Sequence, residues 1–137
     1  MPTLKAALSQ NNPYWIPKER YYELKYFCLQ YPHWKVAYHN LNGLEKHSDY
    51  VTAPSNPYSS DPTAKTASRR SYFSDRMDMV KKAAIETDSV IGSYIFKAVI
   101  NGFSYDVINA RENVPCSRCT YYELYRKFFF ILDKIRG

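Results

Sequence analysis

Residues 113 to 136 read NVPCSRCTYYELYRKFFFILDKIR, and this stretch decides the fold that we expect. Pro115 cannot continue a helix from the preceding segment, because proline lacks a backbone donor and clashes with the turn before it. Ser117 is a favourable N-cap, so a helix of roughly eighteen residues begins there. Apolar residues recur in it at steps of three and four, which predicts one buried stripe. The stripe consists of Tyr121, Leu124, Phe128, Ile131 and Ile135.

The segment before this helix predicts a second, shorter helix. Ser104 can cap it, and it reaches about Arg111 with Val107 and Ile108 pointing inward. Asn113 to Cys116 then form a tight turn. A short helix, a turn of three or four residues and a capped helix have the spacing of a helix-turn-helix, whose second helix enters the major groove of DNA.

The remaining side chains of the last helix are candidates for nucleic-acid binding. Arg118 can read guanine, and Thr120 can contact a thymine methyl or a phosphate. Tyr122 and Arg126 can hold phosphates, and a helix N-terminus itself favours an anion. Glu123 can accept a hydrogen bond from a cytosine amino group, but its charge equally repels phosphate. The expected set is Ser117, Arg118, Thr120, Tyr122, Arg126 and Lys127, with Arg69 and Arg70 of an earlier helix.

The N-terminal part of the chain also has helical periodicity. Pro17 precedes a helix over residues 18 to 30, in which Tyr22, Tyr26 and Leu29 have core spacing. Pro32 starts a second helix that runs to about residue 41, because Asn42-Gly43 is a helix stop signal.

Residues 50 to 60 carry two prolines, four serines or threonines and no charge, which indicates a linker or a surface loop. Asp61-Pro62 starts a long helix to about residue 86, with an apolar stripe of Phe73, Met77, Val80 and Ala84. Thr87-Asp88-Ser89 caps the next helix, which ends at Asn101-Gly102. Its apolar stripe is Val90, Ile91, Tyr94, Ile95, Ala98 and Val99.

We therefore expect an all-α protein in three parts. A small N-terminal helical region occupies residues 1–49, a linker or loop occupies 50–60, and a C-terminal helical bundle with the helix-turn-helix occupies 61–137. No strand-rich fold is expected, because the Val-Ile clusters keep the helical period.

Composition restricts the class of protein further. The net charge of +6 mildly favours a polyanionic partner. The odd count of three cysteines argues against a disulfide framework and fits a reducing compartment. No signal peptide is recognisable, and no apolar run reaches the length of a membrane span. We expect a cytoplasmic protein of a bacterial host cell that has no membrane partner.

Two catalytic or metal-binding alternatives have weaker patterns. Cys116 and Cys119 have zinc-ligand spacing, but a structural zinc site needs four ligands and the histidines lie elsewhere in the chain. We read both thiols as small apolar fillers. Asp75 and Asp78 could suggest a metal-dependent nuclease. They share a helix face with lysines and arginines, however, which is typical of surface ion pairs. We expect no enzyme, no cofactor and no metal.

A second cluster of cations lies on the long helix after residue 60, at Lys65, Arg69, Arg70 and Arg76. It has two interpretations. It is either a solvated helix face or a phosphate clamp that adds affinity without sequence choice.

The segment VPCSRCTYYELYRK (114 to 127) resembles the recognition helix of phage-borne regulators of the ArpU and RinA kind. Gly-Phe-Ser-Tyr at 102 to 105 resembles the entry to the supporting helix of these regulators, and 85 to 101 fits the helix behind it. The resemblance covers about residues 77 to 136. The run from Tyr22 to Trp34 is also similar to the openings of prophage proteins of Gram-positive bacteria.

This resemblance implies a late-gene activator with a C-terminal helix-turn-helix similar to the fourth region of sigma factors. The expected partner is duplex DNA, with host RNA polymerase as a further contact and a homodimer for two half-sites. Two alternatives remain open. One is a phage-encoded inhibitor of a host defence nuclease, such as a CRISPR effector, that acts by protein binding. The other is a small DNA-packaging subunit.

Overall fold

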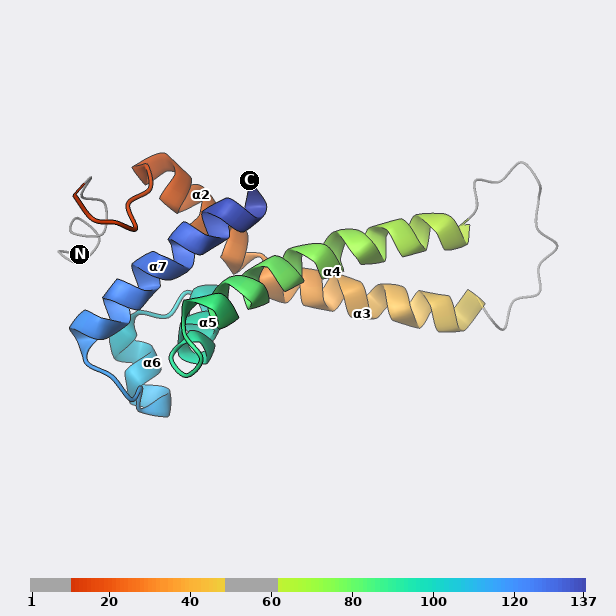
Figure 1. Cartoon of the computed structure of the whole chain (residues 1–137). Helices are drawn as coiled ribbons and strands as arrows, with labels where there is room; N and C mark the ends of the chain where they lie inside the picture. The colour runs from red at the N-terminus through yellow and green to blue at the C-terminus, as the bar shows by residue number, and fades with distance from the viewer. Residues whose placement is uncertain (1–10, 49–61) are drawn as a thin grey trace. The chain divides into compact units, whose positions relative to one another are not determined.

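A computed structural model of the chain describes residues 11–48 and 62–137 (Figure 1). The described residues form only helices and their connections, as expected for an all-α protein. The helices are α2 (Lys18–Leu29), α3 (Tyr31–Ser48), α4 (Pro62–Thr87), α5 (Gly92–Asn101), α6 (Tyr105–Glu112) and α7 (Arg118–Arg136).

The chain divides into two compact units. Among the described residues, the core unit contains residues 11–30 together with Met79–Gly137, and the hairpin unit contains residues 31–48 and 62–78. This division differs from the expected parts 1–49 and 61–137, because α2 contacts α5 and α7 and so belongs to the C-terminal bundle. The expected linker at 50–60 lies outside the described residues.

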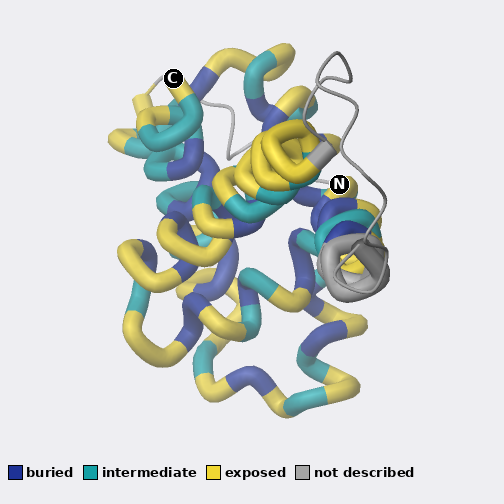
Figure 2. The backbone as a smooth tube through the Cα atoms, turned by 90° about the vertical axis from the view of Figure 1, so that its right-hand side faces the viewer, coloured by how far each residue is buried: buried dark blue, intermediate teal, exposed yellow. Residues whose placement is uncertain are grey.

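The core unit is built around a fully buried aromatic and aliphatic centre. Helices α2, α5 and α7 contact one another. Their most deeply buried residues, none more than 2% exposed, include Phe128, Phe129 and Leu132 of α7, Leu24 of α2 and Ile95 of α5. Figure 2 shows buried positions in dark blue at intervals along the helices of this unit. Burial of such side chains is the main stabilising contribution in a bundle.

Helix α2 faces the bundle with a different side from the one expected. Its buried residues are Tyr21, Leu24, Phe27 and Cys28, whereas Tyr26 is 62% exposed. The expected core spacing of Tyr22, Tyr26 and Leu29 was therefore wrong. Tyr21 and Tyr22 are adjacent aromatics of equal size, so the sequence alone did not indicate which one faces inward.

The hairpin unit contains α3 and the first part of α4, which lie alongside each other (Figure 1). Helix α3 runs through residues 42 and 43 to Ser48, so the expected stop at Asn42-Gly43 was wrong. A glycine inside a helix costs only about 1 kcal/mol relative to alanine, which the rest of a long helix can offset. Helix α4 begins at Pro62 as expected, and the expected cap Asp61 lies outside the described residues.

Asp88 shapes the turn from α4 to α5. Its Oδ2 accepts hydrogen bonds from the backbone N–H groups of Val90 at 2.9 Å and Ile91 at 2.7 Å, which confirms the expected cap. Thr87 instead closes α4, because its hydroxyl donates to the Ala83 carbonyl. Val90, which we expected in the apolar stripe of α5, is 57% exposed because it lies in this capped turn.

Replacing Asp88 by Ala should destabilise the protein by about 1 kcal/mol at neutral pH, because the two N–H groups lose their acceptor. These hydrogen bonds hold the pKa of Asp88 below its ordinary value of 3.8. The stabilisation is therefore complete above that value and is lost as pH falls through the lowered pKa. Urea unfolding of both proteins at pH 7 and at strongly acid pH checks this. If the two proteins differed by the same free energy of unfolding at both pH values, the Asp88 carboxylate would not be the stabilising group.

No helix among the described residues is long and apolar enough to cross a lipid bilayer.

Candidate nucleic-acid interface

Helices α6 and α7 form the expected pair, and both have the expected caps. The Ser104 hydroxyl accepts from the Val107 N–H, and the Ser117 hydroxyl accepts from the Thr120 N–H at 3.2 Å. Helix α6 ends at Glu112, and its C-cap Asn113 has a positive φ of 54° that asparagine tolerates better than most residues. The Asn109 side chain then accepts from the Val114 N–H, which fixes the direction of the turn.

Tyr105 connects the start of α6 to the start of α7. Its hydroxyl donates to the Cys116 carbonyl at 3.0 Å, just before the cap of α7. Its ring packs against Tyr121 and Tyr122, with centroids 5.0 Å and 6.3 Å away. A tyrosine that packs its ring and satisfies its hydroxyl holds both segments in one geometry. Helix α7 is therefore held in place at its N-terminal end.

The buried side of α7 is rotated from the expected stripe. Tyr121 and Phe128 are buried as expected, and Tyr122, Phe129 and Leu132 are buried as well. The remaining members of the expected stripe are only half-buried; these are Leu124, Ile131 and Ile135. The apolar arc is wide because tyrosines and phenylalanines are adjacent in the sequence.

Two predictions about single side chains, one in α7 and one in α6, were wrong. Tyr122 was expected to project outward toward phosphates, but it is 7% exposed and packs on Tyr105, Tyr121 and Tyr125. Val107 of α6 was expected inside with Ile108, but it is 41% exposed whereas Ile108 is fully buried. Tyr122 therefore belongs to the support of α7 rather than to its outward face.

The outward face of α7 is defined by Cys119, Thr120, Glu123 and Lys127. The first three are exposed and Lys127 is half-buried. Their spacing of three and four residues places Thr120, Glu123 and Lys127 on one side of the helix, opposite Tyr125 and Phe129. Thr120 and Lys127 occupy the positions that we expected, and Glu123 lies between them.

Arg118 is exposed but already has partners. Its guanidinium forms an ion pair with Asp106 of α6 and lies over the Tyr105 ring, with 5.4 Å to the centroid. Ion pairs between side chains as exposed as these contribute little stability. Arg118 must nevertheless leave Asp106 before it can bind a base or a phosphate.

Arg126, unlike Arg118, has donor atoms without a partner among the described residues. Its Nε and Nη1 atoms are buried, and neither finds a hydrogen-bond acceptor in the part of the chain that the structure describes. Because these two atoms are not exposed, the Arg126 side chain has to move outward before an anion can reach them. That movement breaks no protein hydrogen bond of these two atoms, whereas a paired arginine would lose one. Lys127 beside it lies close enough to Asp88 to contribute to the low pKa of that carboxyl group, after the backbone hydrogen bonds.

The two expected cations of α4 belong to the hairpin unit. Arg69 is exposed, whereas Arg70 is half-buried and lines a hollow with Tyr38 of α3 and Asp75 of α4. The guanidinium carbon of Arg76 lies 3.3 Å from the ring centroid of Tyr72, and Arg76 also donates a hydrogen bond to the Tyr72 carbonyl. The structure therefore leaves Arg69 as the more accessible of the two predicted residues.

The cysteines differ in exposure. Cys28 is fully buried, Cys116 is half-buried and Cys119 is exposed, so the interpretation of Cys119 as an apolar filler was wrong. Burial raises the pKa of the Cys28 and Cys116 thiols. Within residues 11–48 and 62–137, no three His, Cys, Asp or Glu side chains gather as metal ligands would.

Contacts between α2 and the end of α7 were not predicted from sequence. Arg20 donates to Asp133 at 2.6 Å, and Arg136 pairs with Glu23 at 2.8 Å. The hydroxyls of Tyr21 and Tyr125 are hydrogen-bonded at 2.8 Å. These pairs are more than a hundred residues apart in the chain, which single-sequence periodicity cannot detect. The two ion pairs hold the C-terminal half of α7 against α2, and Tyr105 holds its N-terminal end.

No protein-family model, curated protein or solved structure matches this chain.

Proposed function

We propose that the protein is a phage or prophage DNA-binding regulator that presents the outward face of α7 to duplex DNA. The observation that carries this proposal is the geometry of α6 and α7. Both helices are capped, a tight turn joins them, and α7 has a buried side and an outward side. A recognition helix needs this rigid support, because base contacts require fixed side-chain positions.

The contact residues that support the proposal differ from the sequence set. Thr120 and Lys127 lie on the outward face, and Arg126 beside them offers donors without an acceptor. The Ser117 cap leaves the first N–H groups of α7 as further donors for a phosphate. Arg118 joins this set once it separates from Asp106. Tyr122 is excluded because it is buried.

The assignment to phage regulators rests on the resemblance of residues 114 to 127 and 102 to 105 to the ArpU and RinA kind. In this proposal a homodimer supplies two half-sites, because one helix-turn-helix covers few base pairs. Host RNA polymerase is a further proposed contact.

The exposed thiol of Cys119 provides a direct test, because it lies in the first turn of α7. We expect saturating duplex DNA to slow maleimide modification of Cys119 at least about tenfold, since bound DNA covers that turn. Mass spectrometry separates Cys119 from Cys116, and fully buried Cys28 is the internal control. If anisotropy shows that duplex is bound while Cys119 reacts at its free rate, the binding face is not α7. If no duplex is bound at low salt, a protein target becomes the better explanation.

Replacing Asp106 by Asn should strengthen duplex binding about three- to tenfold at low salt. The change removes a carboxylate that repels phosphate and frees Arg118 from its ion pair. Asp75→Asn on α4 removes the same charge in the hairpin unit and is the matched control. Anisotropy titrations measure both affinities, and equal affinities for the two variants would show that the Asp106 pair does not restrain Arg118.

A further inference from the structure

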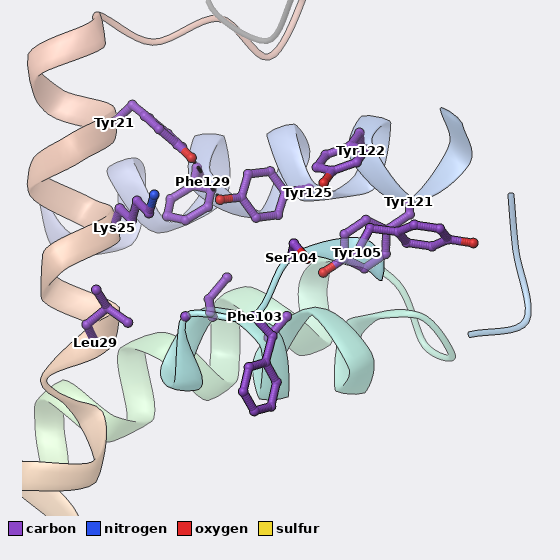
Figure 3. Close-up of a pocket in the computed structure, with 13 residues that line it drawn as sticks. Tyr21, Lys25, Leu29, Phe103, Ser104, Tyr105, Tyr121, Tyr122, Tyr125 and Phe129 are labelled. Atoms are coloured by element: carbon purple, nitrogen blue, oxygen red, sulfur yellow. Dashed lines mark hydrogen bonds between the residues drawn. The ribbon is translucent and has the colours of Figure 1, made fainter. Parts of the chain in front are cut away.

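A small cavity lies within the core unit, beside the packed rings of Tyr105, Tyr121 and Tyr122. Its volume is about 130 Å³, and its walls come from α2, α5, the turn before α6, and α7. Figure 3 shows the aromatic side chains that line it, with Lys25 from α2 at one end and Tyr121 from α7 at the other. Tyr125 and Phe129 lie between these two ends in the same view.

The polar groups of this cavity differ in whether they have partners. The hydroxyls of Tyr21 and Tyr125 bind each other, and the Tyr105 hydroxyl binds the Cys116 carbonyl. The Tyr121 hydroxyl is buried and has no hydrogen-bond partner among the described residues. Burial raises the pKa of Tyr121, so this hydroxyl keeps its proton and remains a donor. It therefore lacks an acceptor.

Lys25 provides a second group without a matching partner. Its ammonium lies 5.9 Å from the Tyr22 ring centroid, and no carboxylate of the described chain pairs with it. Lys25 is half-buried as a residue, and a cation that is partly shielded from water attracts an anion more strongly than a fully solvated one does. The cavity thus has a cation at one end, a hydroxyl donor at the other, and aromatic walls between them.

Size limits the occupant to one ring. An apolar cavity of about 150 Å³ accommodates benzene in another protein, and this cavity is of similar volume. We propose that the cavity binds a single-ring aromatic acid, with its carboxylate on Lys25 and a ring oxygen accepting from the Tyr121 hydroxyl. The tyrosine and phenylalanine walls stack on the ring edge and face. The argument for this site uses only contacts inside the core unit and does not require that α7 binds DNA.

The probes are 4-hydroxybenzoate, benzoate and phenol, titrated into the full chain by calorimetry. We expect 4-hydroxybenzoate to bind at least tenfold more tightly than benzoate, which lacks the ring oxygen, and than phenol, which lacks the carboxylate. In NMR spectra the methyl groups of Leu29 and Val99, which line the cavity, should shift on binding. Absence of heat and of methyl shifts at millimolar 4-hydroxybenzoate would overturn the proposal.

Two variants test the two ends separately. Tyr121→Phe should remove the preference for 4-hydroxybenzoate over benzoate while the protein stays folded, because its hydroxyl has no partner to lose. Lys25→Met should weaken the binding of 4-hydroxybenzoate and of benzoate at least tenfold and leave the binding of phenol unchanged. Lys18→Met, an exposed lysine of the same helix, is the matched control. Binding that neither cavity variant alters would place the probe elsewhere and contradict the assignment.

Discussion

Gly92→Ala should destabilise the protein by about 3 kcal/mol. A Cβ built on Gly92 would lie 2.1 Å from the carbonyl oxygen of Ala84, so α4 and α5 would have to separate. The obstacle is backbone rather than the end of a flexible side chain, and forcing extra volume into a tight contact typically costs 1–3 kcal/mol or more. Helix α5 contacts α2, α6 and α7, so its displacement reaches the whole core unit.

Ser93→Ala is the matched control for this prediction. Ser93 is the next residue of α5 and is exposed, so its loss should change the free energy of unfolding by less than about 0.5 kcal/mol. Urea unfolding followed by circular dichroism measures both variants. Equal midpoints for Gly92→Ala and Ser93→Ala would mean that α4 and α5 do not approach as closely as the structure has them.

Local signals in the sequence predicted the helix boundaries well around the interface. Ser104 and Ser117 were predicted as caps, and each accepts the expected backbone hydrogen bond. Asp88 was likewise predicted and confirmed. These predictions succeed because a cap depends on residues within three positions of one another, which a single sequence contains completely.

The rotation of the helices could not be predicted with the same accuracy. Tyr22 and Tyr122 each stand beside another tyrosine, so either member of the pair could satisfy an apolar stripe. In α2, Tyr21 is the buried member, whereas in α7 both Tyr121 and Tyr122 are buried. The choice depends on partners distant in the chain, such as the hydrogen bond between Tyr21 and Tyr125. Periodicity contains no information about such partners.

Only part of the candidate site could be predicted, because some of its contacts also depend on partners distant in the chain. Thr120 and Lys127 do lie on the outward face, and Arg118 is exposed. The ion pair of Arg118 with Asp106 was not foreseen, because it joins two helices across the turn. The unsatisfied donors of Arg126 depend on packing and also have no sequence signal.

Replacing both Arg126 and Lys127 by Ala should weaken duplex binding about a hundredfold at low salt. Each of the two cations is expected to neutralise one phosphate, and each lost phosphate contact removes about one released counterion. Arg126 moves to a phosphate without losing a protein hydrogen bond, since its buried donors have no acceptor among the described residues. Lys81→Ala with Lys82→Ala removes the same charge from exposed positions of α4 and is the control.

The dependence of duplex affinity on salt concentration tests the central claim that α7 binds DNA. We predict that the Arg126 and Lys127 double variant lowers the magnitude of the slope of log affinity against log salt by about 2, while the Lys81 and Lys82 double variant retains most of the original slope. Thermal unfolding verifies that both variants remain folded. A slope that changes equally in both variants, or no duplex binding by the original chain at low salt, would contradict the account.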